Sequence, residues 1–368
     1  MLEKSLSSYS ESIKKDTKAL GYFEFWPAWL FYLPVYLYVI YLMIRYRSIM
    51  LPTAVNPGLA NGKFIGESKD EILKTICQYL PEYSVKHFLM KRDSALDIST
   101  MLSQALNLLD QEGIDYPFVA KPDLGCRGAG VNLIRSKQEL LNYIQSFPAD
   151  QSFVCQQLIP YESEAGLFYC RMPWESSGKI ISLTLKFFPK TQGDGVHTLR
   201  QLIDMDPRAS KLTHIYHPRL QNRLDAIPEL GEKIALVFAG NHSKGAIFKD
   251  GRQFITQALT ETLDRISKRL PHFYFGRFDI RYASLDKLEK GVDFKIVEIN
   301  GASSESTHIW DSGYGLLEAY RDLFKQFHLL FMIGEYNSKH GAKTQSLKAF
   351  YQSHLLDKKL NKLYPGTH

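Results

Sequence analysis

The chain has 368 residues, of which 45% are hydrophobic and 23% are charged, and its formal net charge is +6. This length is enough for two or three domains' worth of buried core. The basic residues are spread along the chain, which argues against nucleic-acid binding. None of the four cysteines has CxxC spacing, so they predict neither a zinc site nor a disulfide framework and fit a reducing compartment. They are Cys77, Cys126, Cys155 and Cys170.

An uncharged run of twenty residues, 25–44, lies near the N-terminus and is closed by Arg45 and Arg47. At about 1.5 Å per helical residue it can cross a hydrocarbon core of about 30 Å, and its Trp and Tyr residues suit a membrane interface. We therefore expect membrane association through 25–44, with the protein on the cytoplasmic face. Because Pro34 interrupts the run, a kinked, re-entrant or interface-lying helix fits as well as a clean span. A helix or strand pair buried in the soluble fold is the alternative.

Helices and strands alternate between this run and the C-terminal region, by their periodicity and end signals. The expected helices cover 68–79, 97–109, 136–147, 198–203, 256–270 and 315–332. The expected strands cover 84–90, 152–159, 166–172, 179–188 and 233–240, with two more flanking a glycine-rich loop inside 116–135. The basic tail from 339 onward is expected to be a solvated helix, with contact to an anionic membrane surface as the alternative.

Two further segments, 273–282 and 294–300, read FYFGRFDIRY and FKIVEIN and predict strands by their aromatic and β-branched content. Alternate residues of a strand share a face, so pairing of the two would gather their polar side chains in one patch. These are Arg277, Asp279 and Arg281 of the first strand, and Glu298 and Asn300 of the second. Oxygen ligands of this kind suit Mg²⁺, whereas ordinary strand salt bridges are the alternative.

The glycine-rich loop follows Lys121 and contains Gly125, Gly128 and Gly130. Glycines permit close backbone approach to a ligand, their N–H groups can bind phosphate oxygens, and the preceding lysine adds positive charge. An ordinary hairpin turn would also contain glycine, so the order of lysine, strand, loop and strand carries the argument. On the strand 179–188, Lys186 lies on the polar face and is therefore directed at a site.

Taken together over about 67–330, these motifs resemble the ATP-grasp superfamily of carboxylate–amine ligases, with D-alanine–D-alanine ligase as the comparison for the nucleotide and metal motifs. The resemblance implies an α/β (α+β) ATP-grasp fold whose two subdomains clasp ATP, with a reduced N-terminal region that carries the apolar segment. The segments 191–203 and 241–246, which contain GDGVHT and NHSKGA, instead resemble cyanophycin synthetase-like and glutamate ligase-like members. The sequence after Asn300 departs from the D-alanine enzymes where they contact the acceptor, so the substrate stays open.

The resemblance also implies roles for individual residues. Lysines and loop glycines would bind the phosphates of ATP, a hinge would hold adenine, and an acid would bind ribose. The implied ATP-binding residues are Lys69, Lys121, Gly125, Gly128, Gly130, Gln156, Leu158, Ile159, Glu164 and Asn241. The implied metal ligands are Asp279, Glu298 and Asn300, which would hold one or two Mg²⁺, with Mn²⁺ as an alternative. Arg277 and Lys186 would be catalytic.

The implied reaction is ATP-dependent formation of a C–N bond. A carboxylate attacks the γ-phosphate of ATP, an amine then displaces phosphate from the acyl phosphate, and ADP and phosphate are released. The expected partners are a small-molecule carboxylate, of amino-acid or peptide-like type, and an amine; a homo-oligomer is compatible with the sequence. The alternatives are an ATP-grasp phosphotransferase acting on a non-carboxylate acceptor and a membrane-associated ATP-binding protein without turnover.

The expected organisation has four parts. They are an N-terminal segment at 1–50 with the apolar run, a linker and first part of the nucleotide-binding unit at 51–120, the ATP-grasp domain at 121–335, and the basic tail at 336–368. His308 and Asp311 follow the metal motif, and each is a candidate either to orient the acceptor or to be structural.

Overall fold

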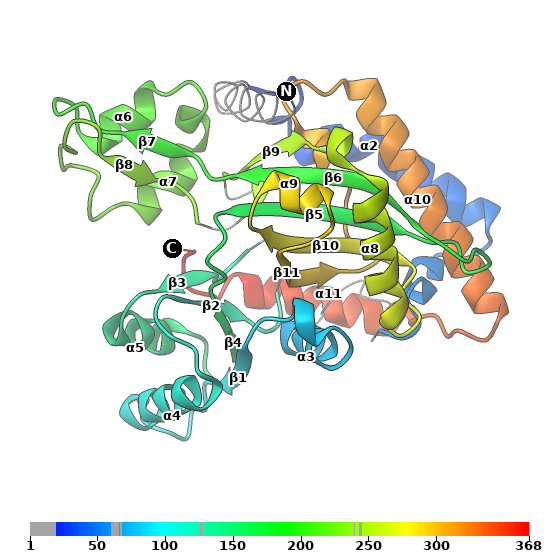
Figure 1. Cartoon of the computed structure of the whole chain (residues 1–368), viewed down its shortest axis with the longest axis horizontal. Coiled ribbons are helices and arrows are strands. Elements are labelled where there is room, and N and C mark those ends of the chain that lie inside the picture. The colour runs from blue at the N-terminus through cyan, green and yellow to red at the C-terminus, as the bar shows by residue number, and fades with distance from the viewer. Residues whose placement is uncertain are drawn as a thin grey trace.

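The structure is a computed structural model, and it describes residues 20–59, 66, 68–125, 128–238, 240–242 and 245–367. Three expected features fall outside these residues: Cys126 in the glycine-rich loop, Ser243 with Lys244 in NHSKGA, and the segment before residue 20. The described chain is built on two main antiparallel sheets with helices packed against them (Figure 1). The expected α/β class is therefore confirmed.

The first sheet has four strands in the order β1-β4-β2-β3. They are β1 (His87–Lys91), β4 (Ser152–Gln157), β2 (Phe118–Pro122) and β3 (Asn132–Ile134). The helices α4 (Ile98–Glu112) and α5 (Lys137–Ser146) pack on it, where Met101 and Ile144 join Phe118 and Phe153 in one buried cluster. We call this sheet with its two helices the first lobe. Asp97 and Ser136 cap the two helices by accepting a hydrogen bond from a backbone N–H of the first turn, as their sequence pattern predicts.

The second sheet has five strands in the order β11-β10-β5-β6-β9. They are β11 (Phe294–Asn300), β10 (Phe275–Tyr282), β5 (Ser163–Cys170), β6 (Lys179–Phe187) and β9 (Ile247–Asp250). One face is apolar and packs on α8 (Gln257–Arg269), where Leu263 and Ile266 meet Leu183 and Phe278. The other face carries the polar side chains of the candidate site. The short helix α9 (Leu285–Glu289) lies in the connection between β10 and β11.

A small lobe follows β6 and stands at one end of the second sheet in Figure 1. It consists of β7 (Lys190–Gln192), α6 (Leu199–Met205), α7 (Thr213–Arg219) and β8 (Lys233–Ala235), with its own buried cluster. Glu24, which precedes the apolar run, is anchored here. Its carboxylate accepts hydrogen bonds from both Nη atoms of Arg208 and lies 2.8 Å from His242 Nε2. Burial raises the pKa of Glu24, but His242 and Arg208 outweigh it and lower the pKa to about 2.

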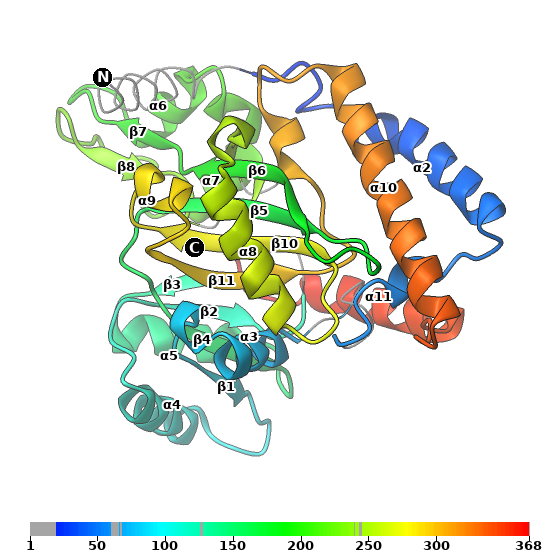
Figure 2. The ribbon, with the colours of Figure 1, turned by 45° about the vertical axis from the view of Figure 1, so that its right-hand side comes forward.

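The apolar run forms α2 (Ala28–Arg45), which lies beside α10 (Leu316–Lys339) in both views (Figures 1 and 2). It is the one helix of the described residues that is long and apolar enough to cross a membrane. Only one stripe of it is buried, with Phe31, Val35 and Leu42 packed inward. The remaining elements are α3 (Lys69–Tyr79), α11 (Leu347–Asn361) and the 3-10 turns η2 (Leu51–Ala54), η4 (Pro81–Tyr83), η5 (Ala209–Leu212), η7 (Arg252–Phe254) and η8 (Thr307–Trp310).

Candidate functional site

The polar face of the second sheet brings the predicted side chains into register. In the antiparallel pairing of β10 with β11, Asp279 lies opposite Glu298 and Arg277 lies opposite Asn300. On the other side of β10, Asp279 pairs with Gly166 of β5. A Cβ atom at Gly166 would lie 2.9 Å from Arg277 Cδ and 3.2 Å from Asp279 Oδ1, so glycine leaves the room that these two side chains occupy.

Asp279 is the centre of a buried network of charges. Its Oδ1 atom lies 3.0 Å from Lys186 Nζ and 2.9 Å from Arg277 Nε, and its Oδ2 atom accepts a hydrogen bond of 3.0 Å from Asn300 Nδ2. Lys186 also donates to Glu164 Oε1 over 2.8 Å. The network therefore joins five of the predicted site residues through direct contacts.

The charges in this network hold one another in the ionised state. Burial raises the pKa of Asp279, but Arg277 and Lys186 outweigh this effect and lower the pKa to about 2. Burial lowers the pKa of Lys186, yet the carboxylates of Asp279 and Glu164 outweigh it, and the pKa is raised. A carboxylate and an ammonium group are therefore both charged at neutral pH on the face where a ligand would bind.

Glu298 differs from Asp279 because its carboxylate has no hydrogen-bond or ion-pair partner among the described residues. Within those same ranges, no three His, Cys, Asp or Glu side chains lie together as a metal-binding group. The predicted ligand set instead combines two carboxylates with the carboxamide of Asn300, and all three offer oxygen. This donor chemistry fits Mg²⁺, which is bound through one or two carboxylates with the remaining positions filled by water or substrate phosphates.

The first lobe contributes a second group of polar side chains, which reach the same strand β11. Lys121 Nζ of β2 donates to Val297 O over 3.5 Å, and Gln156 Nε2 of β4 donates to the same oxygen over 3.3 Å. Burial lowers the pKa of Lys121 to about 8, although the carboxylates of Glu298, Glu164 and Asp279 act in the opposite direction. The structure therefore places Lys121 next to the acids of the second sheet.

Lys69, at the start of α3, lies beside the glycine-rich loop. Its Nζ atom donates to Gly125 O over 2.7 Å. Gly128 and Gly130 follow in the same loop, where Gly130 O accepts a hydrogen bond of 3.0 Å from the Tyr143 hydroxyl. The loop and Lys69 are thus held together, next to the strand that carries Lys121.

The connector between the two lobes contains Leu158 and the buried Ile159. Arg281, which the sequence left without a role, donates from Nη1 to Ile159 O over 3.1 Å, and its Nε atom lies 3.8 Å from Glu164 Oε2. Arg281 therefore fixes the connector to the second sheet. Beside the connector, Gln156 Oε1 is buried and has no hydrogen-bond partner in the described structure, which suits a donor group from a ligand.

The loop after β8 covers the opposite end of the network. A Cβ atom at Gly240 would lie 2.3 Å from Glu164 Oε1 and 3.1 Å from Lys186 Cδ, so the backbone at this position lies directly over the ion pair. Asn241 comes next in the chain, and its carbonyl oxygen accepts a hydrogen bond of 3.1 Å from Ala246 N. Asn241 therefore lies at the edge of the site, next to Gly240, whose lack of a side chain allows this close approach.

The segment after β11 is tied down by buried polar contacts. His308 is 1% exposed and lies between Ser182 Oγ, at 2.7 Å from Nδ1, and Asp322 Oδ2, at 3.0 Å from Nε2. Asp311 Oδ1 lies 3.3 Å from Lys249 Nζ, and its Oδ2 atom accepts a hydrogen bond of 2.8 Å from Asp250 N. These contacts favour the structural alternative for both residues.

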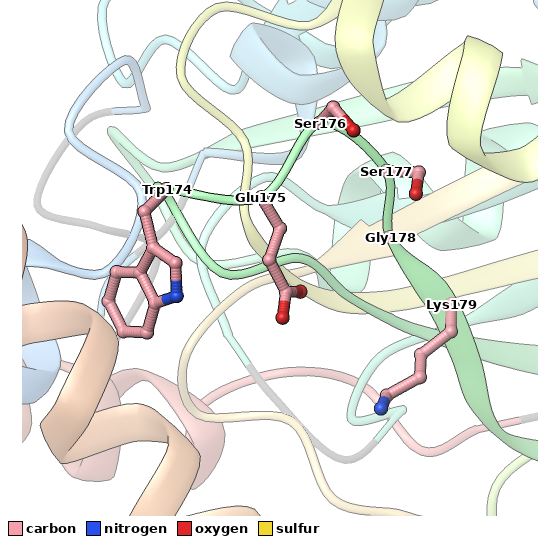
Figure 3. Close-up of a pocket in the computed structure, with 6 residues that line it drawn as sticks. All are labelled: Trp174, Glu175, Ser176, Ser177, Gly178 and Lys179. Carbon is pink, nitrogen blue, oxygen red and sulfur yellow. The ribbon is translucent and has the colours of Figure 1, made fainter.

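A hollow of about 560 Å³ lies elsewhere, at the turn between β5 and β6. Figure 3 shows Glu175 and Lys179 directed to the same side of this turn, next to Trp174. The turn joins the strand ends at Cys170 and Lys179, opposite to the ends that carry Glu164 and Lys186. It is therefore a feature of the surface apart from the polar network.

No protein-family model matches the chain, and no curated protein matches it. Among solved structures it resembles a bifunctional glutathione synthetase from Pasteurella multocida, at 14% identity and a TM-score of 0.34, over 70% of this chain and 36% of that one. It also resembles the VanG D-Ala:D-Ser ligase from Enterococcus faecalis, at 15% identity and a TM-score of 0.40, over 73% of this chain and 61% of that one. A D-alanine–D-alanine ligase from Bacillus anthracis complexed with ATP matches at 13% identity and a TM-score of 0.41, over 74% of this chain and 68% of that one.

These structures are ATP-grasp ligases, the class that the sequence motifs resemble. The match spans little more than a third of the glutathione synthetase and less than two thirds of the VanG enzyme. At TM-scores of 0.34 to 0.41 the likeness carries no argument, and the argument about function rests on the side chains of this chain.

Two contributors to the site have weak signals in the sequence. Gly166 stands inside a strand, where glycine is unfavourable, and this alone could have marked a close approach. Glu305 lies in the divergent segment after Asn300, and its backbone oxygen accepts a hydrogen bond of 3.1 Å from Arg277 Nη1. Its carboxylate accepts hydrogen bonds from the Tyr32 hydroxyl of α2 at 2.6 Å and from Trp310 at 2.9 Å. No local pattern indicates that contact with α2.

Proposed function

We propose that the protein is an ATP-dependent carboxylate–amine ligase that acts through an acyl phosphate. One observation carries the proposal: cationic side chains from two facing sheets meet paired oxygen ligands on adjacent strands. Lys121 of the first lobe faces the buried network of Lys186, Asp279 and Arg277 on the second. Phosphoryl transfer is catalysed mainly by positioning and by electrostatic stabilisation, which such an arrangement supplies.

In this proposal the nucleotide binds between the two lobes. Lys69, Lys121 and Lys186 bind phosphate oxygens together with the amides of the loop at Gly125, Gly128 and Gly130. Adenine lies against Leu158 and Ile159, with the unpartnered Gln156 Oε1 accepting a hydrogen bond from its amino group. Glu164 binds ribose, and Asn241 contacts the nucleotide from the loop above the ion pair.

Asp279, Glu298 and Asn300 hold one or two Mg²⁺ in the proposed site, and Mn²⁺ could take their place. The metal supplies charge neutralisation on the phosphates. Arg277 stabilises the charge of the acyl phosphate and of the tetrahedral centre formed when the amine attacks. Its position is set by the bidentate contact with Asp279 and by Glu305 O. No side chain acts as a covalent nucleophile in this scheme.

The test is a screen for ADP release over amino acids and small carboxylates, with and without an amine. A ligase releases ADP only with its carboxylate, and hydroxylamine traps the acyl phosphate as a hydroxamate. ADP release with a phosphorylated acceptor and no hydroxamate would establish the phosphotransferase alternative instead. Binding of ATP without release of ADP under any condition would leave an ATP-binding protein without turnover.

Lys121 predicts a pH dependence of ATP binding. The ammonium form attracts phosphate, and burial lowers the pKa of Lys121 to about 8. We expect the affinity for ATP to fall by about tenfold or less between pH 7 and pH 9.5, because the lysine loses its proton. Equilibrium binding of ATP across this range measures it. In Lys121→Met the affinity should be lower and independent of pH over this interval, and an unaltered slope in that variant would contradict the assignment.

The proposal includes a location at the surface of a membrane. One stripe of α2 packs on α10, with Tyr38 stacked on Phe324 at a centroid distance of 4.6 Å. The opposite side exposes large apolar side chains, and Trp29, Leu37 and Ile44 are 67%, 61% and 72% exposed. A helix that crossed the bilayer would lose its contacts with α10, whereas a helix lying in the interface keeps them.

The charges around α2 suit an anionic lipid surface. Arg45 and Arg47 are exposed at its C-terminal end, and Glu24, the only acid between residues 20 and 50, is buried against Arg208. Lysine and arginine near an anionic membrane contribute about 1 kcal/mol each. The protein therefore binds through an apolar face flanked by basic residues.

Leu33→Ser combined with Leu37→Ser and Ile40→Ser should lower binding to vesicles that contain phosphatidylserine by at least about tenfold, because exposed apolar area is lost. Co-sedimentation measures the effect, and Leu230→Ser, an 82% exposed position on the small lobe, is the matched control. Alkaline carbonate should release the wild-type protein from membranes. Retention after this wash would show a spanning helix, and equal sedimentation of all variants would contradict the assigned face.

A further inference from the structure

The C-terminal residues lie against the glycine-rich loop, far from them in the sequence. After α11 the chain turns back toward the first lobe, and its C-terminal end lies near β3 (Figure 1). The Tyr364 hydroxyl donates to Leu124 O over 2.7 Å, and Thr367 Oγ1 donates to Gly128 O over 2.7 Å. Asn132 Nδ2 in turn donates to Gly366 O over 3.0 Å. Three hydrogen bonds therefore join the tail to both sides of the loop.

This contact is packed as well as hydrogen-bonded. Leu360 is 3% exposed and Thr367 is 9% exposed. The ring of Tyr364 stacks on Phe147 of the first lobe with centroids 5.5 Å apart. Packing and hydrogen bonds therefore both hold Tyr364 and Thr367 against the first lobe.

The glycines of the loop make room for the tail. A Cβ atom at Gly125 would lie 3.0 Å from Tyr364 Cε2 and 3.1 Å from Asn361 Oδ1. A Cβ atom at Gly130 would lie 2.7 Å from Pro122 Cγ of β2 and 3.1 Å from Tyr364 Cβ. Both glycines also have positive φ angles, of +132° and +68°, which other residues rarely adopt. The need for glycine at these two positions is therefore explained in part by the tail, and not by phosphate binding alone.

The side-chain hydrogen bonds of Tyr364 and Thr367 both engage carbonyl groups of the loop. Leu124 O and Gly128 O accept from the tail, and Gly130 O accepts from Tyr143. In a planar trans peptide the next N–H points away from the carbonyl, so the amides of Gly125, Ala129 and Val131 face the other way. A loop held by its carbonyls on one side presents these amides on the side where an anion can bind.

The end of the tail also reaches the small lobe. Arg219 of α7 donates from Nε to Thr367 O over 3.0 Å and from Nη1 to Leu236 O over 2.8 Å. The segment 361–367 thus runs from the loop of the first lobe to the small lobe, and we call it the strap.

We propose that the strap positions the glycine-rich loop for phosphate binding, with Tyr364 and Thr367 as positioning residues. Its consequence for ATP rests on the proposed function. Without the two side-chain hydrogen bonds the loop samples other conformations, and the amides are no longer held ready for a ligand. Nucleotide phosphates lose affinity, whereas a nucleoside without phosphates does not.

The test uses the full-length variant Tyr364→Phe/Thr367→Ala, which keeps the ring stacking but loses both donors. Hydrogen exchange of the amides of Gly125 and of residues 128–131 should become at least about tenfold faster, and the Kd for ATP should rise by about tenfold, because two hydrogen bonds that hold the loop are lost. The Kd for adenosine should stay within twofold. Tyr351→Phe, at a 61% exposed position of α11, is the matched control and should change none of these.

Unchanged exchange of the loop in the double variant would overturn the proposal, as would faster exchange with an unchanged Kd for ATP. An equal loss of affinity for ATP and adenosine would show general destabilisation and overturn it too. If the wild-type protein binds no ATP, the proposed function fails, and the exchange of the loop alone then decides the role of the strap.

Discussion

Replacing Glu298 by Gln is expected to lower ATP turnover by at least about a hundredfold while leaving the free energy of unfolding unchanged. The carboxylate of Glu298 has no hydrogen-bond or ion-pair partner among the described residues, so we expect the fold not to depend on its charge. The proposed metal does depend on it, because an amide is a weaker ligand for Mg²⁺ than a carboxylate. ADP release and urea unfolding measure the two effects.

Asp279→Asn provides the contrast, because Asp279 carries both roles. It should abolish turnover and also lower the free energy of unfolding by about 3 kcal/mol, since Lys186 and Arg277 lose a buried counter-charge. Glu112→Gln, at an exposed position at the end of α4, is the matched carboxylate-to-amide control. Wild-type turnover in Glu298→Gln would contradict the metal assignment, and equal stability of all three variants would contradict the structural role of Asp279.

Replacing Lys186 by Met should lower stability as much as Asp279→Asn does. Lys186 is 6% exposed and lies between Glu164 and Asp279, at 2.8 Å and 3.0 Å from their carboxylate oxygens. Removing the ammonium group leaves two acids close together with less positive charge between them. We expect the free energy of unfolding to fall by about 3 kcal/mol and ATP turnover to be lost.

Lys69→Met is the matched control for this change. Lys69 is another predicted phosphate ligand, but it is half-buried and donates only to the backbone oxygens of Gly125 and Asp123. Its loss should raise the Kd for ATP at a cost in unfolding free energy of about 1 kcal/mol. Urea unfolding and ATP binding separate the two variants. A stable Lys186→Met protein would show that Arg277 and Arg281 suffice to balance the acids.

The sequence predicts those parts of the fold that have local signals. Ser68 and Thr256 stand at the starts of two expected helices and cap them, because a cap is a local interaction between residues three positions apart. The gathering of Asp279 and Glu298 on one face follows from the alternation of side chains along two strands, whereas the register that sets them opposite each other is seen only in the structure. The strands β7 and β9 were missed, since they have three and four residues and owe their conformation to partners distant in the chain.

Site residues can be predicted from the sequence where a motif contains them. Contacts that depend on the three-dimensional arrangement of distant segments cannot. Arg281 shares a face with Asp279, but its role depends on the backbone of the connector, more than a hundred residues earlier. Glu164 was assigned to ribose, and its ion pair with Lys186 is visible only once β5 and β6 are aligned. Tyr364 has no motif, and its partner Leu124 lies 240 positions away. Contacts between residues so far apart in the sequence leave no local pattern from which they could be predicted.

The buried ion pair between Glu24 and Arg208 bears on which lobe can move relative to the second sheet. Separating the small lobe from the N-terminal segment would expose or strand a buried carboxylate that also contacts His242, at a cost of about 3 kcal/mol or more. Moving the first lobe breaks weaker ties to the second sheet, such as the hydrogen bonds of Lys121 and Gln156 to Val297 O. We therefore expect the first lobe to move more readily than the small lobe relative to the second sheet.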